Sequence, residues 1–316
     1  MDAKNPETVE MTTWDHHRVV LDDECLVPAA RRKAGEGDNE GERFEVTIVK
    51  DGIAEAVRAA QEADVVILCA GNHPLINGRE EIDRPDITLP PSQQQLIKAV
   101  CKANPNTVLV LVASYPVAVN WEQEHLPAIV YTTNCCQELG TGVADALFGD
   151  YNPAGRLNMT WYRSASQLPD IMDYDIIKGG RTYMYFEGEP LYPFGYWLSY
   201  TEFTYSGLEI SGDRFGPDDH IQLRFTVTNT GRAAGDEVAQ VYVRGESKRA
   251  KRPLKQLKGF RRIHLEPGES KTLEFAIPVN DLRRYDVSRE RYCVEAGFYT
   301  IMVGRSSAHI ELAAVV

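Results

Sequence analysis

Hydrophobic and polar positions between residues 44 and 150 alternate between two patterns. Apolar runs typical of strands occupy 44–49 (FEVTIV), 64–70 (DVVILCA), 107–114 (TVLVLVAS) and 127–133 (PAIVYTT). Helical periodicity separates them, at 52–63, 92–103 and 140–150, the last ending at Gly149. Strands that are apolar on both faces and separated by helices are typical of a mostly parallel sheet covered by helices. We therefore predict an α/β sandwich for this region.

The pattern changes to short alternating runs in the last third of the chain. These runs occupy 203–210 (FTYSGLEI), 221–229 (IQLRFTVTN), 237–244 (EVAQVYVR), 271–278 (KTLEFAIP) and 298–304 (FYTIMVG). Turn-forming stretches such as NTGRAAGD and EPGES lie between them. The pattern predicts an antiparallel β-sandwich of about 100 residues.

These sequence patterns divide the chain into four parts. Residues 1–43 are polar and poorly periodic, which predicts a poorly structured N-terminal segment. Residues 44–162 form the α/β part, 163–197 a linker rich in tyrosine, glycine and proline, and 198–316 the all-β part. We expect the linker tyrosines to be packing anchors between the two domains. Trp197 would need room for its indole and a partner for its N–H.

Composition narrows the classes of partner and compartment. The 316 residues carry a net charge of −12, which argues against nucleic acid and anionic membrane surfaces. No apolar run approaches the roughly 20 residues of a membrane span, and the first residues show no signal-peptide pattern, so we expect a cytoplasmic protein. The six cysteines form no CxxC pair, and Cys69 and Cys101 lie among apolar neighbours as expected of small buried hydrophobes. We predict no metal site and no cofactor, since no nucleotide-binding glycine motif and no HExxH is found.

The richest candidate for chemistry is the segment GREEIDR, residues 78–84. It concentrates charge between a predicted strand and a predicted helix, in Arg79, Glu80, Glu81, Asp83 and Arg84. A loop at the carboxyl end of a strand is where open α/β sheets bind ligands. A carboxylate among arginines and other carboxylates has an environment-dependent pKa, as acid/base chemistry requires. The alternative is a solvated loop held by internal ion pairs. For Gln137 and Glu138, in the polar turn NCCQELG, a helix cap and a functional role both stay open.

Several long motifs in a fixed order carry a family resemblance. They include ExxDR, NPNTVLVLVxSYPVAVNW, QELGxGVADALFGDYNPAGRL, GRTYMYF, PLYPFGYxLSYT, RPxKxLKGF and AGFYTIMVG. From about Phe44 to Ser307 the sequence resembles the C-terminal half of glycoside hydrolase family 3. The resemblance implies an α/β sandwich followed by a fibronectin type III-like domain, and β-glucosidase-like hydrolysis of O-glycosyl bonds in carbohydrate metabolism.

The resemblance also implies roles for the charged loop. Family members use a retaining mechanism with two carboxylates, and in many of them the acid/base is the glutamate of an EGxDR motif. Laid on that motif, Glu80 is the acid/base candidate, Asp83 and Arg84 are the DR pair, and Arg79 supports the motif. Glu81 stands where glycine is usual and is the alternative acid/base. Two further departures are Cys136 and Trp197, which stand where relatives have a small residue and glycine.

The resemblance places the nucleophile in an N-terminal (β/α)₈ barrel. Such a barrel needs about 250 residues, whereas about 43 precede the predicted sandwich. We therefore expect a chain with the acid/base glutamate but without the nucleophile, acting on a β-linked oligosaccharide or glycoside. A separate barrel domain or a homo-oligomer is the expected protein partner. The alternatives are a non-catalytic carbohydrate-binding or interaction module of the same ancestry, and one subunit of a split enzyme.

Overall fold

The computed structural model describes residues 51–72, 84, 86–134, 137–246 and 251–316, with the backbone alone of 9–12 and 18–21. Their contacts separate into two units, one of residues 1–115 and 119–135 and the other of residues 116–118 and 136–316. Within residues 1–43, the described backbone forms an antiparallel hairpin of β1 (Val9–Thr12) and β2 (Arg18–Leu21). The boundaries of the four predicted parts stay predictions.

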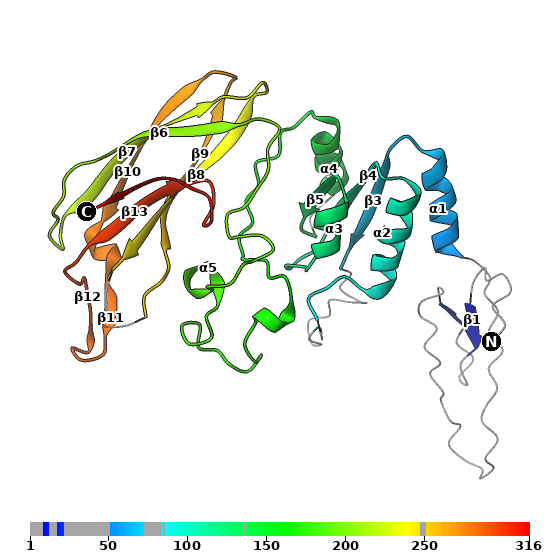
Figure 1. Ribbon diagram of the computed structural model, residues 1–316, viewed down its shortest axis with the longest axis horizontal. Coiled ribbons are helices and arrows are strands. Elements are labelled where there is room, and N and C mark those ends of the chain that lie inside the picture. The colour runs from blue at the N-terminus through cyan, green and yellow to red at the C-terminus, as the bar shows by residue number, and fades with distance from the viewer. Residues whose placement is uncertain are drawn as a thin grey trace, which may run out of the picture. The chain divides into compact units, whose positions relative to one another are not determined.

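The first unit is built on a three-stranded parallel sheet in the order β3-β4-β5 (Figure 1). Its elements are α1 (Gly52–Glu62), β3 (Val66–Gly71), α2 (Pro91–Ala103), β4 (Thr107–Val112), α3 (Asn120–His125) and β5 (Ala128–Thr132). Leu109 and Leu111 of the central strand β4 are fully buried, because neighbouring strands and packed helices enclose it. The predicted parallel α/β fold is confirmed. Short helix α3 was not predicted, and the strand expected at 44–49 lies outside the described residues.

Local side chains fix the ends of these helices. α1 begins where the Asp51 carboxylate accepts a hydrogen bond from the Ala54 N–H at 2.8 Å. Asn104 follows α2, and its side-chain amide donates to the carbonyls of Ala60 and Ala63 at 3.0 and 2.7 Å. The end of α1 is thereby tied to the end of α2.

The second unit ends in a β-sandwich of two antiparallel sheets, β10-β7-β6 and β14-β13-β8-β9, with a separate hairpin β11-β12. Before the sandwich come α4 (Leu139–Phe148), which ends at Gly149 with φ +85° as predicted, a 3₁₀ turn (Ala165–Gln167) and α5 (Thr182–Tyr185). The remaining elements are β6 (Phe203–Ile210), β7 (His220–Asn229), β8 (Gly235–Gly245), β9 (Gln256–Leu265), β10 (Ser270–Pro278), a 3₁₀ turn (Val279–Leu282), β11 (Arg284–Asp286), β12 (Arg291–Cys293), β13 (Tyr299–Gly304) and β14 (Ile310–Val315). The predicted β-sandwich is confirmed.

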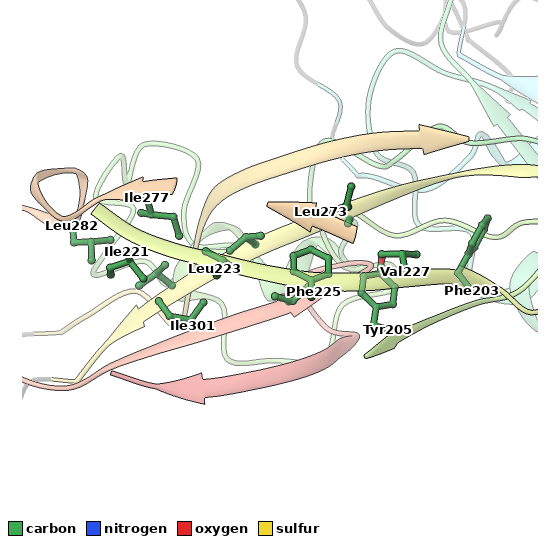
Figure 2. Packing of buried hydrophobic residues seen from close by; sticks show 14 of the residues in the cluster. Phe203, Tyr205, Ile221, Leu223, Phe225, Val227, Leu273, Ile277, Leu282 and Ile301 are labelled. Atoms are coloured by element: carbon green, nitrogen blue, oxygen red, sulfur yellow. The ribbon is translucent and has the colours of Figure 1, made fainter. Parts of the chain in front are cut away.

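The core of the sandwich follows the period-two pattern of its strands. On β7 the side chains of Ile221, Leu223, Phe225 and Val227 point inward and are buried, while the residues between them point outward (Figure 2). Phe225 stacks on Phe275 of β10, with ring centroids 5.8 Å apart. Apolar burial on alternate positions therefore holds the two sheets together.

The outer face of β8 is buried as well, by the tyrosine-rich segment before the sandwich. Tyr242 and Gln240 point away from the core, yet both are buried. Tyr183 meets Tyr242 edge to face, stacks on Phe194, and accepts the Leu257 N–H at 3.1 Å. The Gln240 amide donates to the Gly195 carbonyl at 3.3 Å. The predicted linker therefore packs on the sandwich along this face.

Three side chains depart from expectation. Cys69 is exposed and Cys101 is only half-buried, so the prediction that both are buried was wrong. Cys69 lies on β3 at an apolar groove of about 410 Å³ lined by α1 and α2. The indole of Trp197 finds room, edge to face with Phe203 and beneath the Arg156 guanidinium, which lies 4.0 Å from the ring centroid. Its buried N–H has no hydrogen-bond acceptor among the described residues.

Candidate functional site

Polar side chains gather at the carboxyl edge of the parallel sheet, where each of the three strands ends. Asn72 follows β3, Ser114 and Tyr115 follow β4, and Asn134 follows β5. Because the carboxyl ends of parallel strands meet at one edge, residues distant in sequence lie together there. Asn72 is the last described residue before residues 73–83, which include most of the charged segment 78–84.

A side-chain amide holds the end of β3. The Gln93 side chain, in the first turns of α2, accepts the Gly71 N–H at 3.0 Å and donates to the Gly71 carbonyl at 3.0 Å. The fit requires glycine, because φ is +151° and an added Cβ would lie 1.7 Å from the Val112 carbonyl oxygen. The end of β3 is therefore fixed by backbone packing and by a paired amide.

A chain of hydrogen bonds links the three strand ends. The Asn72 carbonyl Oδ1 accepts the Ser114 N–H at 2.7 Å, and the Asn134 amide donates to the Ser114 hydroxyl at 2.8 Å. The Asn72 amide also donates to the Tyr115 hydroxyl at 3.3 Å. These groups form a frame of side chains that connects the three strand ends.

Tyr115 contacts the chain on both sides of residues 73–83. Its hydroxyl meets Asn72 before them, and its ring lies under the Arg84 guanidinium after them, 4.2 Å from the centroid. Burial lowers the pKa of Arg84, while Tyr115 and Asp86 oppose that shift. A guanidinium group is a cation in neutral solution. One tyrosine therefore holds both ends of residues 73–83 together, beside a fixed positive charge.

The predicted site residues divide between the described and the undescribed parts of the chain. Arg84 is placed, as above, and Arg79, Glu80, Glu81 and Asp83 lie outside the described residues. Glu138 occupies the N-cap position of α4 without a side-chain bond to the helix backbone, and its carboxylate instead accepts the Thr141 hydroxyl at 2.8 Å. No group of three metal-ligating side chains occurs among the residues described. None of the helices in that part of the chain is long and apolar enough to cross a membrane.

The frame of Asn72, Gln93, Ser114, Tyr115 and Asn134 was not predicted. A signal was available, since Tyr115 and Asn134 directly follow predicted strands, Ser114 is the last residue of one, and Asn72 lies two residues after another. Parallel strands end at one edge, which would have brought these residues together. Gln93 carried no such signal, because a glutamine in the first turn of an exposed helix is common. Only the fold brings it to Gly71.

The arrangement of a parallel sheet with a polar carboxyl edge, followed by an antiparallel sandwich, agrees with what comparison with known proteins finds. The sequence model of the glycosyl hydrolase family 3 C-terminal domain matches residues 5–200, and that of the fibronectin type III-like domain matches residues 237–307. The first of these models covers more than half of the chain. The chain belongs to glycoside hydrolase family 3 and carries its C-terminal domain.

Individual relatives agree with this assignment. The chain is 38% identical to a periplasmic β-glucosidase of Salmonella typhimurium over 82% of this chain and 35% of the relative, and 36% identical to a β-xylosidase of Formosa agariphila over 84% of this chain and 37% of the relative. Among solved structures, a β-glucosidase of Kluyveromyces marxianus in complex with glucose matches with a TM-score of 0.76 and 34% identity, covering 86% of this chain and 34% of that one. The chain thus spans about a third of the length of the relatives that it matches.

Proposed function

We propose that this chain supplies the acid/base side of a retaining, β-glucosidase-like glycosidase. The observation that supports this most directly is the frame around Tyr115, which contacts Asn72 and Arg84, the residues on either side of 73–83, at the carboxyl edge of the sheet. A general acid acts only when its carboxyl group is held within hydrogen-bond reach of the leaving oxygen. One side chain that contacts the residues on both sides of Glu80's segment favours such positioning more than unanchored flanks would.

In the proposed mechanism, Glu80 is the acid/base. Protonated Glu80 gives its proton to the glycosidic oxygen as the bond from that oxygen to the anomeric carbon breaks. An aspartate of the family's barrel domain would attack the anomeric carbon and form the covalent glycosyl intermediate. Ionised Glu80 then removes a proton from water, which attacks that carbon and releases the sugar and the aspartate. Glu81 beside Glu80 would raise the pKa of Glu80 by like-charge repulsion, which favours the proton-donating form. A β-linked oligosaccharide or glycoside is the proposed substrate.

The test is complementation. The part of the Salmonella relative that lies outside its match to this chain would be produced separately and mixed with this chain, with an aryl β-glucoside as substrate. We expect background hydrolysis from this chain alone and measurable hydrolysis from the mixture. Glu80→Gln should lower that activity about 10²- to 10⁴-fold, and Glu81→Gln much less. Azide should restore part of the Glu80→Gln activity, because a small anion attacks the glycosyl intermediate without a general base.

Three results would contradict the proposal. Equal losses from Glu80→Gln and Glu81→Gln, with azide rescuing neither, would leave the loop as a structural ion-pair cluster. Hydrolysis by this chain alone that disappears in Glu80→Gln would mean that the second carboxylate lies within this chain. A mixture that binds a β-glycoside but never cleaves it would favour a non-catalytic carbohydrate-binding module.

A variant pair tests the frame separately from the acid/base. Tyr115→Leu removes the ring under Arg84 and the hydroxyl that meets Asn72, and we expect the complemented kcat to fall about 10- to 100-fold through misplacement of the loop. Tyr115→Phe keeps the ring and should cost less than about 3-fold, because the hydroxyl contact at 3.3 Å is long. Both variants should keep the wild-type pH dependence of kcat, since neither removes the titrating group.

A further inference from the structure

A short segment between α4 and the sandwich presents an unusual amount of apolar surface. Five side chains of residues 170–178 are between 45% and 79% exposed, namely Ile171, Met172, Tyr174, Ile176 and Ile177. We call this segment the apolar loop. Single exposed hydrophobic residues are ordinary, but five within seven positions form a patch of the kind that marks an interaction site.

Three aspartates give the apolar loop a defined shape. The carboxylates of Asp170, Asp173 and Asp175 each accept the backbone N–H two residues further on, at 2.8, 3.0 and 3.1 Å. Asp175 accepts a second backbone N–H, from Lys178, at 2.9 Å. The aspartate carboxylates of the loop thus accept hydrogen bonds from its own backbone, and the apolar side chains between these aspartates are exposed to solvent.

The base of the loop is closed by Arg181. Its guanidinium donates to the carbonyls of Asp170 and Asp173, and its backbone N–H donates to the Ile176 carbonyl at 3.0 Å. Gly179 allows the close turn, because a Cβ there would lie 2.9 Å from the Asp175 carbonyl oxygen. Immediately after the base, the Thr182 N–H donates to the Tyr162 hydroxyl at 3.0 Å, which anchors the loop within its unit.

The chemistry of the patch favours a protein partner over a sugar. Four of the five side chains are aliphatic or thioether groups, and only Tyr174 offers an aromatic face for stacking on a pyranose ring. Interface centres are rich in such groups and poor in free charge. An ordered segment that keeps these groups in water gains nothing from them until another surface covers them.

We propose that the apolar loop is a docking surface for the part of a family 3 hydrolase that lies outside this chain. About two thirds of the Salmonella and Formosa relatives lies outside the matched region, so a large surface absent from this chain accompanies this domain in those proteins. The inference rests on the proposed function, which requires that same part to bring the nucleophile. The partner surface should be apolar, with little charge opposite the loop.

The first experiment is hydroxyl-radical footprinting of the full chain with and without the folded complementary part of the Salmonella β-glucosidase, its folding verified by a cooperative thermal transition. We expect the oxidation rates of Met172 and Tyr174 to fall at least 3-fold on mixing. Tyr292 and Phe298, which are exposed on the sandwich, should be oxidised at unchanged rates. Equal protection of all four side chains, or of none, would overturn the proposal.

The second experiment measures the dissociation constant of the same mixture by biolayer interferometry. Met172→Ser with Tyr174→Ser, at positions 75% and 79% exposed, should weaken binding at least 10-fold. The matched control, Val287→Ser with Phe298→Ser, at positions 80% and 68% exposed, should change it less than 2-fold. Equal affinities for the two double variants would overturn the proposal, as would the absence of wild-type binding. Concentration-dependent self-association of this chain that only the loop variant abolishes would assign the loop to a second copy instead.

One further variant separates this inference from the proposed function. Glu80→Gln should bind the complementary part with the wild-type dissociation constant while losing hydrolysis. If Glu80→Gln keeps full activity while the loop variant fails to bind, the acid/base assignment fails and the docking surface stands. If Glu80→Gln is inactive and the loop variant binds normally, the docking surface fails and the assignment stands.

Discussion

Replacing Arg156 should show how much a buried ion pair contributes to the stability of the second unit. Arg156 donates to Glu237 at 2.8 Å, and the two side chains are 10% and 0% exposed. Its guanidinium also donates to the Ala154 carbonyl at 2.8 Å and covers the Trp197 ring at 4.0 Å. Burial lowers the pKa of Arg156 to about 10 and raises the pKa of Glu237. We predict that Arg156→Met leaves the buried Glu237 carboxylate without its cationic partner.

The size of the effect follows from these contacts. Losing a charge-assisted hydrogen bond costs about 1.5–3 kcal/mol, and losing the desolvated cation–π contact costs up to about 2 kcal/mol. Breaking a buried ion pair by removing one partner typically costs about 3–5 kcal/mol in total. That is a large share of the roughly 5–15 kcal/mol by which proteins are stable. Against a urea m-value of about 2.5 kcal/mol/M, the midpoint should fall by between about 1 and 2 M.

The loss should depend on pH with a definite sign. Burial raises the pKa of Glu237 even against the attraction of Arg156, so the pKa of this carboxyl group should rise further in Arg156→Met. The folded variant then binds a proton more tightly than the unfolded chain, and its stability increases as the pH falls. The difference in unfolding free energy from wild type should therefore be largest at pH 8 and smaller at pH 5.

Urea titrations of the wild type, Arg156→Met, Glu237→Gln and the double variant, followed by tryptophan fluorescence at both pH values, complete a double-mutant cycle. The double variant should lie within about 2 kcal/mol of wild type, because no charge is left buried and Gln can still accept the Val238 N–H that Glu237 accepts at 2.8 Å. A loss below about 1 kcal/mol for Arg156→Met, unchanged between pH 5 and pH 8, would refute the reasoning.

Three further predictions concern single contacts. Gly71→Ala should destabilise the chain by about 2–4 kcal/mol in thermal melts, because its Cβ would strike the Val112 carbonyl oxygen, while Gly52→Ala, with open space at Cβ, should be neutral or slightly stabilising. The Asp236 carboxylate, 2.7 Å from the imidazole, raises the pKa of His264. This exposed pair therefore contributes fully to the free energy of unfolding below about pH 6.5, and the contribution is lost as the pH rises through the pKa of His264 in the folded state. The melting temperature should therefore fall slightly between pH 6 and pH 8, by the equivalent of no more than about 1 kcal/mol, and His264→Gln should flatten that slope. Tyr183→Phe leaves the Leu257 N–H without its acceptor and should cost about 1–2 kcal/mol with faster amide exchange at Leu257, whereas Tyr292→Phe on an exposed ring should change neither.

The sequence was most informative where burial follows a local period. Strand β6 has the predicted bounds, Phe203–Ile210, and α4 ends at Gly149 because a left-handed residue there stops the helix. The parallel sheet could be predicted from its uninterrupted apolar runs, because a strand covered by helices on both faces of the sheet buries every side chain. In each case the local sequence pattern indicates which positions are buried or where the element ends.

Strand β9 was not predicted, because its sequence, QLKGFRRIHL, places basic residues among the apolar ones without regular alternation. It pairs only with β8 within its sheet, so one side of the strand is an edge and its charged residues can reach water. On the outer face of β8 the reverse holds, because polar Gln240 and Tyr242 are buried where a strand pattern predicts exposure. The residues that cover them are distant in sequence, and Gly195, which Gln240 contacts, lies 45 residues before it. An irregular segment that covers a sheet has no periodicity to reveal where it lies.

The candidate site shows the same division. The charged loop and its position after a strand could be recognised along the chain, because charge density and strand pattern are local properties. That Asn72 meets Tyr115, 43 residues further on, and that Arg84 lies over the same ring, could not. These contacts arise because parallel strands bring their carboxyl ends to one edge, and the strand order that places β3 beside β4 is set by packing of the whole sheet. Local chemistry therefore determined which residues could act, and tertiary packing decided which side chains hold them.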